Sequence, residues 1–175
     1  MVASRVAIRE VQRPLRERYQ ADPNAARTTL RVHAGDADLA DPLHCEVSAG
    51  SARYRAGAHA LVGGHGDVPC SGDLLLAALA ACQEITLRMV AANMGIELEA
   101  LDIDVEGDWD ARGTLAFSGA PIGLTAIRCT TRATVRDDAR GDRAERLLRS
   151  AEKYCVVLNT LRAGVPVESR FELRS

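Results

Sequence analysis

The chain has 175 residues and a mass of 18.8 kDa, which is the size of one ordinary domain. Its 22 basic and 24 acidic residues give a net charge of -2, and this balance excludes non-specific binding to nucleic acid. Aromatic residues make up 3% of the chain, too few for a stacking platform along a single strand. Lys153 is the only lysine, which excludes a Gly-Lys-Ser/Thr phosphate loop.

The first twenty residues carry charges throughout and contain no apolar core of a secretory signal. The longest strongly apolar run, Leu74 to Cys82, is too short to span a bilayer, which needs about 20 residues. We therefore expect a cytoplasmic protein without membrane contact, in which cysteines stay reduced. The odd number and irregular spacing of the cysteines do not fit a structural disulfide framework. They are Cys45, Cys70, Cys82, Cys129 and Cys155.

The N-terminal part predicts a helix followed by three strands. Residues 5–21 form a charged surface helix, with Pro14 starting its second half. Three strands are expected at Thr28–Val32, Cys45–Val47 and Ser51–Val62. We expect residues 1–27 to be a helical extension and residues 28–175 to form a single domain.

The strongest predicted element is an apolar helix from Leu74 to Met94, which contains no proline or glycine. The loop before it ends at Ser71, a candidate N-cap, and Gly95 ends the helix. Asp73 would lie in the first turn, where the helix dipole favours an acidic residue. Because apolar residues cover nearly all of its first half, this helix should be central and buried.

The remainder of the chain predicts strands and two further helices. An amphipathic helix is expected at Arg143–Tyr154, and a short helix at Cys155–Ala163 is ended by Gly164. The whole pattern, with strands before and after the helices, indicates an α+β fold. The strands expected in this part are Ile96–Val105, Gly113–Phe117, Leu124–Val135 and Val165–Leu173.

Two of the cysteines, Cys82 and Cys155, are candidates for a chemical role. Cys82 lies in the middle of the apolar helix, and its neighbours one turn away are mostly apolar. Taken alone, it fits a buried structural cysteine, since apolar burial raises a thiol pKa and a reactive Cys82 would need a cationic partner. Cys155 follows the amphipathic helix and by itself also fits a structural role. A peroxide-reducing pair would need one thiolate to become a sulfenic acid and a second thiol to condense with it.

Two segments resemble the OsmC/Ohr family of osmotically inducible and organic hydroperoxide resistance proteins. The first is GGHGDVPCSGDLLLAALAACQEITLRMVAANMGIELEALDIDVEGDWD, and the second is AEKYCVVLNTLRAGVPVE. The resemblance covers roughly Gly63 to Leu173. Each segment alone is a weak signal, whereas a Leu/Ala-rich helix with Cys82 and a Y-C-V-V-x-N-T-L segment some 70 residues later is a fairly specific combination.

This resemblance implies an intertwined homodimer with antiparallel sheets, a long buried central helix and two sites at the dimer interface. It also implies a cysteine-based peroxidase that uses no metal, haem or other cofactor. Cys82 matches the attacking cysteine of the family and Cys155 the resolving one. Family members hold the thiolate with an arginine that a glutamate orients, and dithiol reductants, lipoyl groups among them, recycle the disulfide.

The chain departs from the family pattern in two places, which indicates a divergent OsmC-like branch. Gly72 stands where the family has its glutamate, and the nearest acid is Asp73, one methylene shorter and about 100° further round the helix. Val156 stands where the family has a proline. Arg31 and Arg53, both on N-terminal strands, are the candidates for the arginine that holds the thiolate.

Other residues offer alternative roles. Cys70, in the loop before the apolar helix, is either an alternative resolving thiol, a substitute for the missing acid, or a loop cysteine with no role. A metal site would have to draw on Cys70 and four residues before it in the chain, two of them from a neighbouring strand. No CxxC or HxxxH spacing supports that site, so we expect no metal. The four residues are His44, Cys45, His59 and His65.

The sequence thus supports two functional hypotheses. The first is thiol-dependent reduction of organic hydroperoxides in oxidative stress defence, with Cys82 attacking, Cys155 resolving and a dithiol as reductant. An apolar lining from Leu75, Leu79 and Ile85 would favour alkyl hydroperoxides over hydrogen peroxide. The alternative is a non-catalytic OsmC-like protein that binds a small apolar ligand or senses redox state at the dimer interface. The glutamate missing at Gly72 favours the alternative, whereas cysteines at both family positions favour the enzyme.

Overall fold

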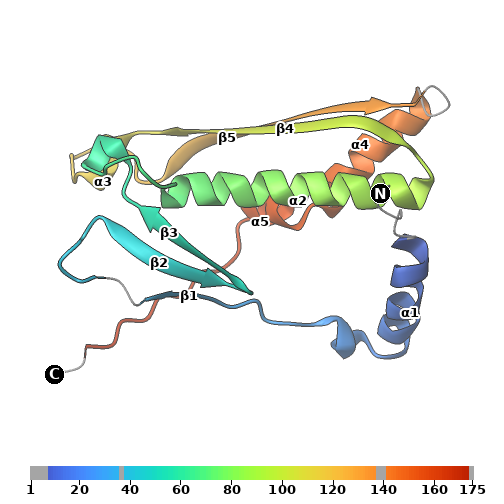
Figure 1. Cartoon of the computed structure of the whole chain (residues 1–175), viewed down its shortest axis with the longest axis horizontal. Helices are drawn as coiled ribbons and strands as arrows, with labels where there is room; N and C mark the ends of the chain where they lie inside the picture. The colour runs from blue at the N-terminus through green and yellow to red at the C-terminus, as the bar shows by residue number, and fades with distance from the viewer. Residues whose placement is uncertain (1–7, 36–37, 137–140, 174–175) are drawn as a thin grey trace.

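The computed structural model describes residues 8–35, 38–136 and 141–173 of the chain. It confirms an α+β fold with antiparallel sheets arranged around a long central helix (Figure 1). The N-terminal sheet has the order β1-β2-β3 and is antiparallel throughout. Its strands are β1 (Val32–Gly35), β2 (His44–Ala49) and β3 (Ala52–Gly57).

The central helix α2 (Ser71–Met94) begins and ends at well-formed caps. Its N-cap is Cys70 rather than the expected Ser71. The Cys70 sulfur accepts a hydrogen bond from the Asp73 backbone N–H, and the Asp73 carboxylate accepts one from the Cys70 N–H at 2.8 Å. This reciprocal capping box starts the helix three residues earlier than expected. Gly95 ends the helix with a φ of 65°, a left-handed conformation that glycine adopts without strain.

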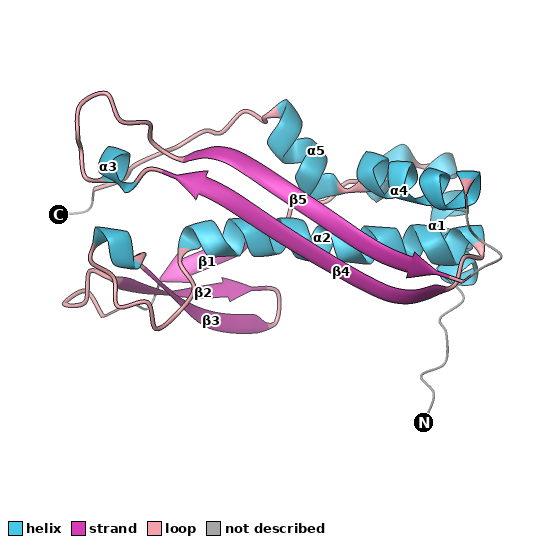
Figure 2. Cartoon of the chain, turned by 90° about the horizontal axis from the view of Figure 1, so that it is seen from above, coloured by secondary structure: helices cyan, strands magenta, loops and turns pink. Residues whose placement is uncertain are grey.

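A long two-stranded hairpin covers one side of α2 (Figures 1 and 2). Its strands β4 (Leu98–Trp109) and β5 (Leu124–Val135) pair antiparallel, and β5 has the predicted bounds. Side chains alternate between the more and the less exposed face along both strands, as expected of a sheet with one covered face. Gly107 lets β4 approach closely, since a Cβ there would lie 3.3 Å from the Leu76 side chain of α2.

Two shorter helices pack on the other side of α2, namely α4 (Asp142–Tyr154) and α5 (Val156–Ala163). The core cluster joins α2, α4 and the start of the hairpin, and burying these apolar side chains is the main stabilising contribution on this side. Its fully or nearly buried members are Leu87, Ala91, Ile96, Leu147 and Ala151.

The N-terminal helix α1 (Ile8–Ala21) is followed by the 3-10 turn η1 (Pro23–Ala26). Pro14 lies inside this one helix and does not separate two halves, and residues 5–7 of the predicted helix lie outside the described residues. The α1 helix contacts the C-terminal end of α2, where the Arg9 side chain donates to the Asn93 carbonyl and Asn93 donates to the Gln12 side chain at 3.1 Å.

Several strand predictions are wrong or displaced. Residues 113–117, expected as a strand, lie at the end of the short helix α3 (Ala111–Thr114) and in the turn after it, because the Asp110 side chain caps a helical turn. Residues 165–173 form no strand, since no described strand pairs with them and an extended segment needs such pairing. The first strand is β1 rather than residues 28–32, and the third ends at Gly57, before the 3-10 turn η2 (Ala60–Val62).

The chain by itself leaves much apolar surface uncovered. Its accessible surface is 13452 Å², whereas a compact monomer of this mass exposes about 8,300 Å². The expectation of a buried α2 holds only in part, because five of its 24 residues are buried. The α2 helix is long and apolar enough to span a membrane by length and composition. It is nevertheless the core helix of the fold, since β4, α4 and α5 pack against it.

Candidate functional site

The site centres on the junction between α4 and α5, where Cys155 is fully buried and interacts with Cys82 of α2. Cys155 ends α4 and is also the N-cap of α5, with an extended backbone (φ −71°, ψ 108°) that turns the chain between the two helices. The first backbone N–H groups of α5 therefore have no partner within their own helix and point toward α2.

Asn159 holds this junction together. Its side-chain amide donates hydrogen bonds to the carbonyl oxygens of Cys155, Lys153 and Glu152, at 2.7, 3.1 and 3.2 Å. Those oxygens include the last carbonyls of α4, which have no partner within that helix. One side chain thus fixes the end of α4 and the start of α5, and thereby fixes the position of the Cys155 thiol.

Cys82 lies on the face of α2 that meets this junction. Burial of the Cys82 thiol raises its pKa. The backbone N–H of Val157 and the thiol of Cys155 hydrogen-bond to the Cys82 sulfur and lower its pKa. Thr86, one turn along α2, and the N–H of Val156 act in the same direction. The favourable bonds outweigh burial, so the Cys82 pKa lies below its usual value, as is typical of a thiol at a helix N-terminus.

The two thiols of the pair differ in acidity. Burial raises the pKa of Cys155, and the neighbouring Cys82 thiolate raises it further. The first proton lost from the pair therefore leaves Cys82, while Cys155 keeps its proton and donates it in a hydrogen bond. A third cysteine, Cys129 on β5, lies near enough that a negative charge on it raises the pKa of Cys155. None of the five cysteines forms a disulfide in this structure.

Most of the expected supporting residues lie away from Cys82 within the chain. Arg31 precedes β1, where it donates to the Thr29 carbonyl, and Arg53 lies in β3. Cys70 and Asp73 form the capping box at the start of α2. At 1.5 Å per helical residue they are about 18 and 14 Å along the axis from Cys82, too far to contact it. Gly72 lies in the same first turn.

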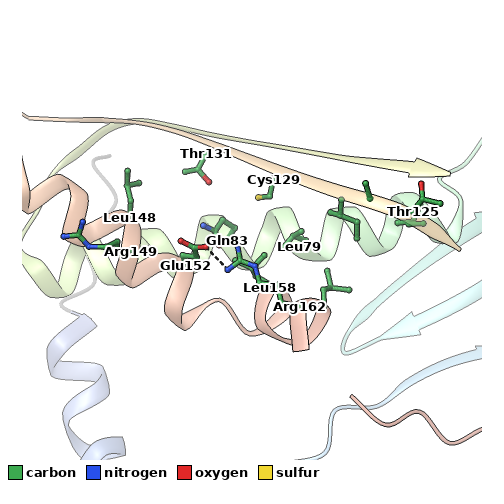
Figure 3. A pocket seen from close by; sticks show the side chains of 14 residues that line it. Leu79, Gln83, Thr125, Cys129, Thr131, Leu148, Arg149, Glu152, Leu158 and Arg162 are labelled. Carbon is green, nitrogen blue, oxygen red and sulfur yellow. Dashed lines mark ion pairs between the residues drawn. The ribbon is translucent and has the colours of Figure 1, made fainter. Parts of the chain in front are cut away.

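A cavity of about 600 Å³ opens between α2, β5, α4 and α5 (Figure 3). Of the three expected lining residues, Leu79 lines this cavity, whereas Leu75 and Ile85 do not and are 41% and 54% exposed. Gln83, Cys129, Glu152 and Arg162 line it as well.

The residues weighed for a metal site take other roles. His44 hydrogen-bonds to Asp41 at 2.8 Å and to Asp67 at 3.1 Å, and its ring stacks on that of His65. His59 caps η2 and meets the Trp109 ring edge-on. Within residues 8–35, 38–136 and 141–173, no cluster of three or more His, Cys, Asp or Glu side chains could hold a metal ion.

Sequence reasoning missed the groups that act most directly on Cys82. The backbone N–H groups of Val156 and Val157 have no side-chain signature, so only the three-dimensional position of α5 reveals them. Thr86 lies one turn from Cys82 along α2. This spacing is the one sequence feature that could have indicated its contact with Cys82. Asn159 belongs to the Y-C-V-V-x-N-T-L segment, but its role depends on the bend at Cys155.

Comparisons with known proteins agree with this architecture. Residues 64–170 match the family model described as OsmC-like protein. None of the curated proteins compared with the chain matches it in sequence. Among solved structures, an OsmC-like protein of Mycoplasma pneumoniae is 17% identical with a TM-score of 0.61, over 78% of this chain and 89% of that one.

Two further structures share the fold. An OsmC-like protein of unknown function from Vibrio cholerae is 11% identical with a TM-score of 0.63, over 77% of this chain and 94% of that one. A protein of Legionella pneumophila described as an organic hydroperoxide resistance protein OsmC is 23% identical with a TM-score of 0.55, over 78% and 91%. The family match covers well over half of the chain, and the chain therefore belongs to the OsmC-like protein family.

Proposed function

We propose that this protein reduces organic hydroperoxides through the thiols of Cys82 and Cys155. The observation that carries the proposal is the hydrogen-bonded pair itself, in which Cys82 has a lowered pKa and Cys155 remains protonated beside it. A thiolate next to a protonated thiol is the arrangement that two-step peroxide reduction requires. The family includes proteins described as organic hydroperoxide resistance proteins, which supports the same reaction class.

The reaction balances in three steps. The Cys82 thiolate attacks the outer oxygen of R–O–O–H, and the O–O bond breaks. With one proton the leaving alkoxide becomes R–OH, while Cys82 becomes a sulfenic acid. The Cys155 thiol then condenses with the sulfenic acid, which forms a Cys82–Cys155 disulfide and releases water. A dithiol reductant exchanges with this disulfide, becomes a disulfide itself and restores both thiols.

Thiolate stabilisation at Cys82 comes first from the N-terminus of α5. Two backbone N–H groups of that helix bond to the sulfur, and the positive end of the helix dipole favours a negative charge there. The N-terminal sheet that carries Arg31 and Arg53 lies at the N-terminal end of α2 (Figure 1). We therefore propose that these arginines approach a pair of reactive thiols only in a dimer, where they would face the thiol pair of the other subunit.

The uncovered surface supports a homodimer. The chain exposes roughly 5,000 Å² more than a compact monomer of its mass would. Isolated exposed apolar residues are ordinary, but this excess per chain is larger than the roughly 1,000–2,500 Å² that each partner of an obligate dimer buries. The exposed residues include Leu30 and Val32 near the N-terminal sheet and Val167 and Phe171 in the C-terminal segment. A second copy that exchanges these segments would cover them.

A non-catalytic role, ligand binding or redox sensing, is the second candidate function. The observation in its favour is that Gly72 occupies the position of the family's glutamate, so the arginine–glutamate arrangement of the family is incomplete at that position. The two candidates differ in turnover, since a binding protein or a sensor does not consume hydroperoxide repeatedly.

The test is hydroperoxide consumption with dithiothreitol as the dithiol reductant. The wild-type protein is expected to consume many equivalents of cumene hydroperoxide, and Cys82→Ser is expected to consume none beyond background. Cys129→Ser is the matched control, because it removes a neighbouring thiol that the mechanism does not use. Turnover that persists unchanged in Cys82→Ser would refute the assignment, and wild-type protein without turnover would favour the binding or sensing role.

A further inference from the structure

The cavity between α2, β5, α4 and α5 has the features of a ligand site, and neither Cys82 nor Cys155 lines it. Its apolar wall comes from three separate elements, with Leu79 on α2, Leu148 on α4 and Leu158 on α5 (Figure 3). Its volume of about 600 Å³ lies within the range of small-molecule sites. An alkyl chain would lie against these leucines and lose contact with water.

One polar group inside the cavity has no partner. The Gln83 side chain is 7% exposed and lines the cavity, and its Oε1 accepts no hydrogen bond within the described residues. A buried acceptor without a donor is costly and rare in folded proteins. A ligand that donates a hydrogen bond to Gln83 Oε1 would remove that cost, so this atom indicates which ligand group the cavity accepts.

The charges around the cavity are already paired. Arg162 on α5 contacts Glu152 on α4 at 2.7 Å, and Arg149 contacts Glu145 at 3.1 Å. An anionic ligand would compete with a carboxylate for a guanidinium, and a cationic ligand would compete with a guanidinium for a carboxylate. An uncharged ligand enters without disturbing either pair.

We propose that this cavity binds an uncharged alkyl alcohol, with its chain against Leu79, Leu148 and Leu158 and its hydroxyl donating a hydrogen bond to Gln83 Oε1. The hydroxyl is the smallest uncharged group that supplies the missing donor. The proposal does not depend on reaction at Cys82, because Gln83 and Cys129 define the cavity independently of the thiol pair.

Cys129 provides a direct readout, because its thiol lines the cavity (Figure 3). The experiment measures alkylation of Cys129 by N-ethylmaleimide in the Cys82→Ser/Cys155→Ser protein, with 1-octanol as the probe. It is run at alkaline pH, because burial raises the pKa of the Cys129 thiol. We expect 1-octanol to slow alkylation of Cys129 and to leave alkylation of Cys45, on the N-terminal sheet, unchanged.

The isomeric ether 1-methoxyheptane tests the hydrogen bond, since it has the same number of atoms but no donor. It should protect Cys129 at a concentration about fivefold higher than 1-octanol, which is the ratio that one neutral hydrogen bond contributes. In Gln83→Met, which keeps the volume and removes the acceptor, the two probes should protect equally. Gln20→Met, on α1, is the control that should retain the preference.

Two results would overturn the proposal. One is a Cys129 alkylation rate that 1-octanol does not change, which would mean that the cavity is filled or closed in solution. The other is equal protection by the alcohol and the ether in the protein that retains Gln83. Because the reactive pair is already substituted in this experiment, neither result bears on hydroperoxide reduction.

Discussion

Cys82 illustrates how a side chain that sequence alone places in an apolar setting can still be acidic. Its neighbours along α2 predict burial and a raised thiol pKa. The structure instead supplies donors from a segment more than 70 residues away, the first turn of α5, together with the Cys155 thiol. Burial and hydrogen bonding thus oppose one another at one sulfur atom, and the hydrogen bonds prevail.

The lowered pKa predicts the pH dependence of alkylation at Cys82. A thiol reacts as its thiolate, so its alkylation rate rises with pH and levels off above its pKa. The profile of Cys82 should therefore level off at lower pH than that of Cys155, whose pKa is raised. The measurement is iodoacetamide labelling across a pH series, with both peptides quantified by mass spectrometry. The reverse order of the two profiles would contradict the assignment of the thiolate to Cys82.

Cys82 and Cys155 could be singled out from the sequence as candidate reactive thiols, because each lies in a segment that resembles the family. The groups that stabilise the Cys82 thiolate could not be predicted from the sequence. The sequence indicates Arg31 and Arg53 by their place on N-terminal strands and Asp73 by its place beside Gly72, yet the groups that shift the Cys82 pKa include backbone N–H groups of α5 and none of these three. Backbone donors depend on where a helix begins in space, and a sequence pattern carries little information about that position.

The bend between α4 and α5 is the element on which the site depends. The backbone of Cys155 must be extended for α5 to start there. The Asn159 amide donates hydrogen bonds to the carbonyl oxygens that the bend leaves without a helical partner. Without this bend the helix would continue past Cys155, and the N–H groups of Val156 and Val157 would bond within it. The thiolate stabilisation is therefore a consequence of a helix boundary.

Replacing Val156 with proline tests that consequence. Val156 is the first residue of α5, a position that tolerates proline, and the extended backbone of Cys155 suits a following proline. The variant removes one of the two N–H donors to Cys82, so alkylation of Cys82 at neutral pH should slow by about threefold. Val156→Ala keeps the N–H and is the control. Identical rates in the two variants would show that this donor does not stabilise the thiolate.

Element prediction succeeded where periodicity and end signals agreed. The strand β5 and the helices α4 and α5 lie within a residue of their predicted bounds, because their apolar spacing and the glycine stop at Gly164 are clear. The start of α2 was misplaced because Cys70 is an unusual N-cap. Residues 113–117 have a strand-like composition, but the local cap at Asp110 decided in favour of a helical turn.

The molecule as a whole exposes more surface than a compact monomer of its mass would, which agrees with the proposed homodimer. Its central helix is rich in apolar residues, yet the chain's own elements bury only five of its 24 residues. The C-terminal segment has the alternation of a strand but has no pairing strand in the described chain, and Phe171 there is 92% exposed. The α+β class could be predicted from sequence, whereas the separation of the two sheets could not.

The proposed homodimer predicts the mass of the protein in solution. Light scattering after size exclusion should give a mass close to twice 18.8 kDa. Val167→Asp/Phe171→Asp should shift the protein toward the monomer, because losing two buried apolar side chains from each subunit costs about 8 kcal/mol, on the order of a millionfold in the dissociation constant. Ser169→Asp adds charge to the same segment without removing an apolar group, and it should remain dimeric. A wild-type monomer at micromolar concentration would contradict the proposed homodimer.

The central claim is that Cys82 and Cys155 act as one redox pair, and non-reducing peptide mapping tests it most directly. Fully reduced protein is mixed with one equivalent of cumene hydroperoxide, quenched by alkylation and digested without reductant. The account predicts rapid formation of a Cys82–Cys155 disulfide that is absent in Cys82→Ser. If Cys82 remains a free thiol through minutes of exposure, or if it pairs with Cys70 instead, the account is contradicted.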